Sequence, residues 1–213
     1  MISFNIEQKY KTEIDAIWNE ERYKSIPYID RGYAVQRDIP YGSILFIGIN
    51  PSYSEIKTRE RNSFFYNNHQ QKEVHQYFRK FQDISEKTNT EWSHLDLLFI
   101  RQTDQKIVKS IFNDTIGKEF LEKQLVISKS IIEKSKPKII VVSNAYARDL
   151  FIDHCKIQTV FDENLGTDKI INNPDLEGTP IFFTSMLSGQ RALDNGSYKR
   201  LIWHINFVQK QMK

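Results

Sequence analysis

The chain has 213 residues, of which 39% are apolar and 27% are charged, a composition close to the average of globular domains. This length suffices for one substantial core and is short for two, so we expect residues 1–213 to form a single domain. The formal net charge of +3 and the pI near 8.8 are compatible with an anionic partner but do not identify one.

The single cysteine, Cys155, cannot form an internal disulfide. A lone thiol beside His154 also supplies too few ligands for a structural zinc ion or an iron–sulfur cluster. His69 and His75 lack the i, i+4 spacing of a helical metal site. We therefore expect no metal and no cofactor.

No apolar signal region opens the sequence, and nowhere do eighteen apolar residues run together. These patterns predict a cytoplasmic protein that does not enter a membrane. The sequence leaves the oligomeric state open, and a monomer is the working expectation.

Apolar residues at helical spacing predict an N-terminal helix at about residues 6–24 that packs on the core, followed by a loop over 25–38. The uniformly apolar run 43–49 predicts a strand that is buried on both faces. Asn50 precedes Pro51, which favours extended backbone at the asparagine and marks the end of the strand.

The rest of the chain continues the alternation of helices and strands. Further strands are predicted at 95–100, 138–143 and 180–185, and further helices at 74–84, 120–136, 145–151 and 198–208. Four buried strands that alternate with helices indicate a parallel sheet covered on both faces. The predicted fold class is therefore α/β, as a three-layer α/β/α sandwich with a central four-stranded parallel sheet.

Polar segments follow the four predicted strands. They are residues 50–52, 101–104, 143–146 and 185–191. Because the sites of open parallel sheets form outside the carboxyl ends of the strands, we expect these segments to meet around a ligand such as a small heterocycle or a phosphate.

Three stretches resemble the uracil-DNA glycosylase superfamily. GINPS at 48–52 resembles the first motif of the mismatch-specific thymine/uracil branch, where a strand ends in Gly-Ile-Asn-Pro-Gly. Residues 120–151 are similar to a helix–proline–strand–helix segment of the thermophilic branch. TSMLSGQR at 184–191 aligns with the second motif, which reads His-Pro-Ser-Pro-Leu-Ser in the commonest branch. The resemblance implies a uracil-DNA glycosylase-like fold.

The resemblance also implies an activity, hydrolysis of the N-glycosidic bond of uracil or another damaged or modified base that is flipped out of double- or single-stranded DNA. Asn50 would position the attacking water through its amide. An amide cannot act as a general base, so the reaction would forgo roughly 10²–10⁴-fold in rate.

Further roles follow from the same resemblance. The residues implied to bind the base are Ile49, Pro51, Tyr53, Phe64, Phe65, Arg101 and Gln102. Those implied to hold the DNA are Ser52, Ser185, Ser188 and Arg191, with Leu187 as a wedge that enters the base stack. The small and polar neighbours of Leu187 predict that it lies on an exposed loop.

Each of these assignments has a structural alternative. An asparagine before proline is an ordinary turn element. Phe64 and Phe65 belong to a residue type that is commonly buried, and Leu187 could be a core residue. For acid–base chemistry, the remaining candidates are His69, His94, Glu55 and Asp104.

Two positions differ from the family pattern. Phe183 stands where the second motif has histidine, and residues 184–186 replace Pro-Ser-Pro. These differences keep a second hypothesis open, a catalytically inactive glycosylase-fold protein that binds DNA. A third hypothesis, a small-molecule α/β hydrolase or a nucleotide-binding domain, is disfavoured because no Gly-x-Ser-x-Gly, P-loop or Gly-x-Gly-x-x-Gly motif occurs.

Overall fold

The computed structural model describes residues 2–55, 60–65, 75–189 and 192–212. Within them, the strands of the main sheet are β4 (Ile44–Gly48), β6 (Trp92–Asp96), β7 (Ile139–Val142), β8 (Thr159–Asp162), β9 (Thr167–Ile170) and β10 (Pro180–Phe183). The spatial order is β6-β4-β7-β10-β9-β8. The first four strands are parallel, and β9 and β8 are added antiparallel. The predicted α/β class is confirmed, but the sheet is six-stranded and mixed, not four-stranded and parallel, because residues 159–170, for which no strand was predicted, contribute a hairpin.

The α-helices are α1 (Ile6–Asn19), α2 (Arg79–Thr88), α3 (Gln105–Ile111), α4 (Thr115–Ser135), α5 (Ala145–Asp149) and α6 (Asn195–Gln211). Short 3₁₀ helices span Glu21–Tyr23, Ile29–Arg31 and Gln76–Phe78, and a π-helical turn, Leu150–His154, follows α5. All the α-helices except α2 begin after an asparagine or aspartate whose side chain accepts a backbone N–H, which satisfies donors that the first helical turn leaves unpaired.

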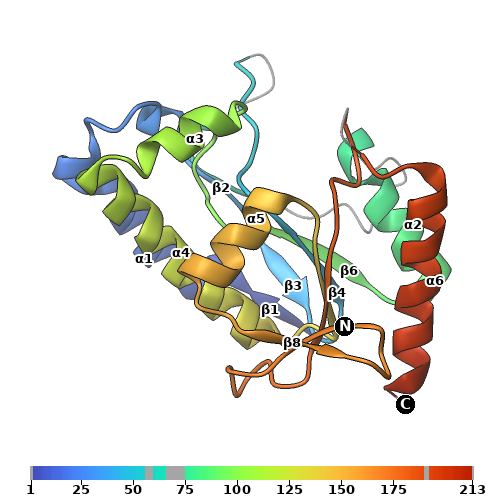
Figure 1. Ribbon diagram of the computed structural model, residues 1–213. Helices are drawn as coiled ribbons and strands as arrows, with labels where there is room; N and C mark the ends of the chain where they lie inside the picture. Colours follow the sequence, from blue (N-terminus) through green and yellow to red (C-terminus); the bar gives the residue numbers. More distant parts are fainter. Residues whose placement is uncertain (1, 56–59, 66–74, 190–191, 213) are drawn as a thin grey trace.

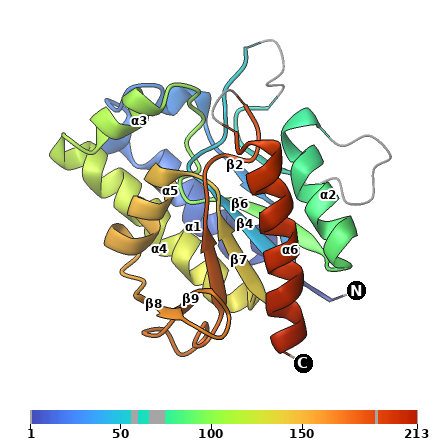
Figure 2. The same cartoon turned by 45° about the vertical axis from the view of Figure 1, so that its right-hand side comes forward.

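Helices cover both faces of the main sheet. In β4, Leu45 and Ile47 belong to the apolar cluster that also contains residues of α1 and α4. Ile44 and Phe46, which alternate with them, belong to the cluster that contains residues of α2 and α6. The ribbon shows the two helical layers on opposite sides of the strands (Figure 1, Figure 2). This arrangement explains why β4 is apolar at every position, since both of its faces are buried.

Two small sheets lie beside the main one. β1 (Ser3–Asn5) pairs antiparallel with β3 (Asp38–Pro40), and β2 (Ala34–Gln36) pairs parallel with β5 (Ser63–Phe65). The expectation of a loop over 25–38 is therefore wrong in part. The strands were not recognised because each has only three residues and depends on a partner distant in sequence.

The second strand of the main sheet ends at Asp96, well before the predicted end at residue 100. Residues 97–100 are fully buried but lie outside the strand. The backbone N–H groups of Leu97 and Leu98 donate to the carbonyl oxygens of Gly48 and Ile49, and side chains of α4 satisfy other backbone groups of this segment. The backbone N–H of Phe99 donates to Gln124 Oε1 at 2.7 Å, and Ser128 Oγ donates to the Leu97 carbonyl oxygen at 2.7 Å. The apolar run is thus a buried connection rather than a strand.

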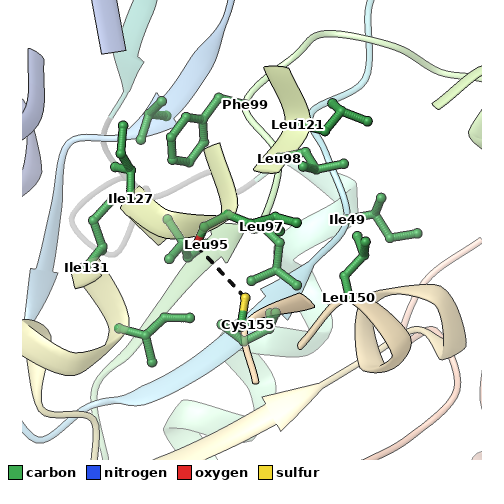
Figure 3. Close-up of a cluster of buried hydrophobic side chains, with 14 of the residues drawn as sticks. Ile49, Leu95, Leu97, Leu98, Phe99, Leu121, Ile127, Ile131, Leu150 and Cys155 are labelled. Carbon is green, nitrogen blue, oxygen red and sulfur yellow. Dashed lines mark hydrogen bonds between the residues drawn. The ribbon is translucent and has the colours of Figure 1, made fainter. Parts of the chain in front are cut away.

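Cys155 lies within the apolar cluster that α4 contributes to (Figure 3). Its Sγ donates to the Leu125 carbonyl oxygen at 3.9 Å. Burial raises the pKa of the thiol to about 12, so at neutral pH the group stays protonated and acts as a small apolar side chain.

Candidate functional site

A pocket of about 510 Å³ lies at the carboxyl ends of the parallel strands. It is formed by Gly48–Ser52 after β4, Asp96 at the end of β6, Arg101–Thr103, Ser143–Asn144 after β7 and Met186–Ser188 after β10. The volume falls in the range of roughly 300–1,000 Å³ that small-molecule sites occupy. The polar strand ends expected to meet do therefore surround one cavity.

The pocket depends on a glycine at the end of β4. Gly48 pairs with Asp96 of β6 in the parallel register. A Cβ atom at Gly48 would lie 2.2 Å from Asp96 Oδ1 and 2.8 Å from His94 Nε2, distances that side-chain atoms do not tolerate. Gly48 therefore leaves the space that both polar side chains occupy.

His94 is enclosed by aromatic rings. Its ring centroid lies 5.8 Å from that of Tyr77, 5.4 Å from that of Phe78 and 5.7 Å from that of Phe81. Among the described residues, neither ring nitrogen has a hydrogen-bond partner. Burial lowers the pKa of His94 to about 3, because an apolar surrounding disfavours the imidazolium ion. At neutral pH the ring is uncharged.

Asp96 lies on the same face of β6 as His94, two residues further on, and its side chain is 12% exposed. The distance from His94 Nε2 to Asp96 Oδ1 is 3.5 Å. Burial raises the pKa of Asp96 to about 8, since the desolvated carboxylate is disfavoured and the neighbouring imidazole carries no charge. The carboxyl group is therefore mostly protonated at pH 7.

Asn50 lines the pocket directly after β4, where the sequence places the end of the strand. Its Nδ2 donates to the carbonyl oxygens of Pro51, at 3.1 Å, Ile100, at 3.3 Å, and Gln102. No donor in the described part of the chain reaches Oδ1. The amide is thus fixed through its nitrogen, which leaves its oxygen to accept a hydrogen bond from a ligand or a water molecule.

Gln102 and Arg101 both line the pocket but differ in their hydrogen bonding. Gln102 is 4% exposed; its Oε1 accepts from the Asp104 backbone N–H, while its Nε2 has no partner among the described residues. Arg101 is already engaged, because its guanidinium donates to Ser63 Oγ at 2.6 Å and to the Tyr33 carbonyl oxygen at 3.1 Å. Arg101 therefore braces the wall of the pocket, and Gln102 Nε2 is a buried donor from which no described residue accepts a hydrogen bond.

The other residues predicted to bind a base divide into two groups. Ile49, Pro51 and Phe65 line the pocket. Tyr53 and Phe64 are not among its lining residues. The Arg31 guanidinium lies 4.3 Å from the centre of the Tyr53 ring, and Phe64 packs edge-on against the core residue Tyr33 with centroids 5.6 Å apart.

Of the residues predicted to hold DNA, Ser52 and Ser188 line the pocket and Ser185 is exposed outside it. The exposed position expected for Leu187 is wrong. Its side chain is 1% exposed and belongs to the apolar cluster beneath α2 and α6, so it forms a pocket wall and not a protruding wedge. Arg191 lies outside the described residues.

Of the four residues predicted as acid–base candidates, one lines the pocket. His94 lines the pocket, His69 is outside the described residues, and Glu55 is exposed. Asp104 accepts the Lys106 backbone N–H at 2.8 Å as the cap of α3. The acidic residue of the pocket is Asp96, which was missed because it was assigned to the interior of a strand. The polar residues 94 and 96, on one face of an otherwise apolar segment, were the available signal.

In the described part of the chain, no cluster of three or more histidine, cysteine or acidic residues could hold a metal ion. The described helices include none that is long and apolar enough to span a membrane. No family model matches the chain, and no curated protein matches its sequence. Fold and site together define an α/β protein with a strand-end pocket that contains a buried carboxylic acid.

Proposed function

We propose that this protein is a DNA N-glycosylase of the uracil-DNA glycosylase type, which hydrolyses the N-glycosidic bond of uracil or another damaged or modified base. The observation that carries the proposal is the position and hydrogen bonding of Asn50. It follows the strand of the GINPS motif and lines the pocket. Its nitrogen is anchored, and its oxygen accepts from no donor of the described residues.

The fold supports this assignment. Strands β6, β4, β7 and β10 form a continuous parallel set with helices on both faces, as the resemblance requires of a three-layer α/β/α domain. We regard the antiparallel β8–β9 hairpin as an extension of that domain at one edge of the sheet.

In the proposed reaction, a water molecule donates a hydrogen bond to Asn50 Oδ1 and directs its oxygen at C1′ of the deoxyribose. The base occupies the pocket after the nucleotide has flipped out of the stack, which costs a few kcal/mol. Phe65 is the aromatic residue on the pocket wall that was expected to stack on the base, and such a contact contributes roughly 1–3 kcal/mol. Ser52 and Ser188 would contact the flanking phosphates.

The test is a strand-cleavage assay for abasic sites. The oligonucleotides carry uracil, hypoxanthine, xanthine, a thymine mismatch, or hydroxymethylated or glucosylated cytosine. Wild type should cleave at least one of them, and Asn50→Ala should lose that cleavage while it still binds DNA. Unchanged cleavage by Asn50→Ala would remove Asn50 from the mechanism.

Asn50→Ala also removes the anchor of three backbone carbonyls, so a matched control is required. Asn173 is buried and donates Nδ2 to Glu133 Oε1 at 2.6 Å, outside the pocket. Asn173→Ala should be destabilised in thermal unfolding but should keep full cleavage below its melting temperature.

The same assay decides the competing hypothesis of an inactive DNA-binding protein. Salt-sensitive binding of the oligonucleotides without cleavage of any would favour that hypothesis. Absence of both binding and cleavage would overturn both.

A further inference from the structure

The pocket contains buried polar atoms that the described residues leave unpaired. His94 is 3% exposed and Gln102 is 4% exposed, and neither ring nitrogen of His94 nor Gln102 Nε2 has a partner there. A buried polar group without a partner costs about 1–3 kcal/mol, and native proteins retain few of them. Both residues lie on the wall of the pocket that also contains Asp96, so the wall is polar at this place.

Asp96 is the carboxyl group of this cluster, and in the described part of the chain no lysine or arginine is placed to ionise it. The charged side chain on the pocket wall, Arg101, is directed to Ser63, Tyr33 and the Glu60 carbonyl oxygen. The neighbour of the carboxyl is the His94 ring at 3.5 Å, and that ring is enclosed by apolar rings. The geometry therefore keeps a protonated carboxylic acid in the pocket.

We propose that Asp96 is a further catalytic residue, the acid that protonates the departing base, and that His94 is its positioning residue. The inference rests on the proposed glycosylase function. It narrows the substrate to a base that carries a ring carbonyl on the edge facing Asp96, because a carboxylic O–H needs an acceptor there.

The chemical step balances as follows. The C1′–N bond breaks and its electron pair goes to the base, while the Asp96 proton moves to a carbonyl oxygen of that base. The oxygen of the water held by Asn50 bonds to C1′. The proton that this water loses passes to solvent, from which the Asp96 carboxylate is reprotonated.

This assignment explains how a site without a general base could work. Asn50 cannot remove a proton from water, so the leaving group must be activated instead. General acid catalysis typically contributes 10²–10⁴-fold, and a donor in a desolvated pocket acts strongly on charge that develops on the base.

The decisive comparison is Asp96→Asn against Asp104→Asn. The amide that replaces Asp96 keeps the shape and a hydrogen-bond donor but has no proton to release. Asp104 caps α3 outside the pocket, and asparagine caps helices equally well. In single-turnover cleavage, Asp96→Asn should lose about 10²–10⁴-fold in rate with unchanged DNA affinity, and Asp104→Asn should match wild type. Equal rates for Asp96→Asn and wild type would overturn the proposal.

The pH profile separates proton donation from a merely structural role. The wild-type rate should fall above pH about 8, where Asp96 ionises, and Asp96→Asn should lose this fall. The other titratable or charged groups on the pocket wall are His75, Tyr77, His94 and Arg101. His75→Gln, a change at the exposed member of this set, should keep the fall. Persistence of the fall in Asp96→Asn would overturn the proposal.

An infrared spectrum tests the acid without substrate. A protonated-carboxyl band should be present at pH 7 in wild type and missing in Asp96→Asn; its absence from wild type would overturn the inference. If wild type shows the band but cleaves no substrate, the proposed function fails, and proton delivery to a base fails with it. If wild type cleaves and Asp96→Asn cleaves equally, only the role of Asp96 fails.

Discussion

Gly48 and Asp96 are paired across β4 and β6, and the absence of a side chain on one makes room for the carboxyl group of the other. The glycine of the GINPS motif thus has a steric role that is independent of turn formation. Its backbone lies inside a strand, and the space beside it is already taken by Asp96 Oδ1 and His94 Nε2.

Gly48→Ala should therefore displace the Asp96 carboxyl. We expect about a 10²-fold loss of cleavage, the effect of misplacing a catalytic group by about 1 Å, and about 1–3 kcal/mol lower stability from overpacking. The control is Gly117→Ala in α4, where the new Cβ would lie 2.3 Å from the Ile111 carbonyl oxygen, outside the pocket. A comparable loss of cleavage in the control would show that destabilisation, and not displacement, is the cause.

The contribution of Asp96 to stability should fall as pH rises from about 4 to about 8. The folded Asp96 holds its proton up to about pH 8, whereas its ordinary pKa is 3.8, so folding takes up a proton between these values. The slope should approach 1.4 kcal/mol per pH unit, roughly the conversion for one proton. Urea unfolding of wild type and Asp96→Asn at a series of pH values would measure this slope as the difference between the two proteins. His94 contributes with the opposite sign below about pH 6.5, but this contribution is common to both proteins and cancels in the difference. Parallel curves would contradict a raised pKa.

His94→Leu should raise the free energy of unfolding by about 1 kcal/mol at pH 7, because an apolar side chain replaces a buried imidazole that has no hydrogen bond to any described residue. The surrounding rings of Tyr77, Phe78 and Phe81 suit such a replacement. Urea denaturation with an unchanged m-value would measure the gain, and cleavage should decrease because Asp96 loses its neighbour. A loss of stability would show that the ring nitrogens are hydrogen-bonded in solution.

Leu187→Ala should cost about 2–5 kcal/mol as a large-to-small change in a packed wall. Cleavage of single-stranded and double-stranded substrates should drop by the same factor, since the side chain is buried. Leu176, buried outside the pocket, supplies the control Leu176→Ala, which should lose stability and keep the rate. A loss of cleavage confined to duplex substrates would support the predicted role of Leu187 as a wedge in the base stack.

The sequence was sufficient to predict the parallel strands and their polar ends because strands buried on both faces produce uninterrupted apolar runs. The run of β4 and the Asn50–Pro51 pair located the strand end to within two residues. The same reasoning brought the segments after β4, β7 and β10 to one pocket.

The end of the second predicted strand could not be located in this way. Residues 97–100 are as apolar as a strand but are buried beneath α4, where the side chains of Gln124 and Ser128 take over part of the backbone hydrogen bonding. An apolar run indicates burial and not hydrogen bonding, so the predicted strand ended too late. Asp96 was therefore placed inside the predicted strand and was not considered as a site residue. The burial of Leu187 was equally hidden, because its polar neighbours lie on the surface and the residue does not.

Cys155 gives the chain a built-in reporter of global opening. Because it is the only thiol in 213 residues and lies inside the core with its proton firmly held, a thiol-specific reagent can reach it only in molecules whose core has opened. Its labelling rate, read at a fixed reagent concentration, would rank every variant above by how often the domain unfolds under native conditions, without denaturant and without DNA.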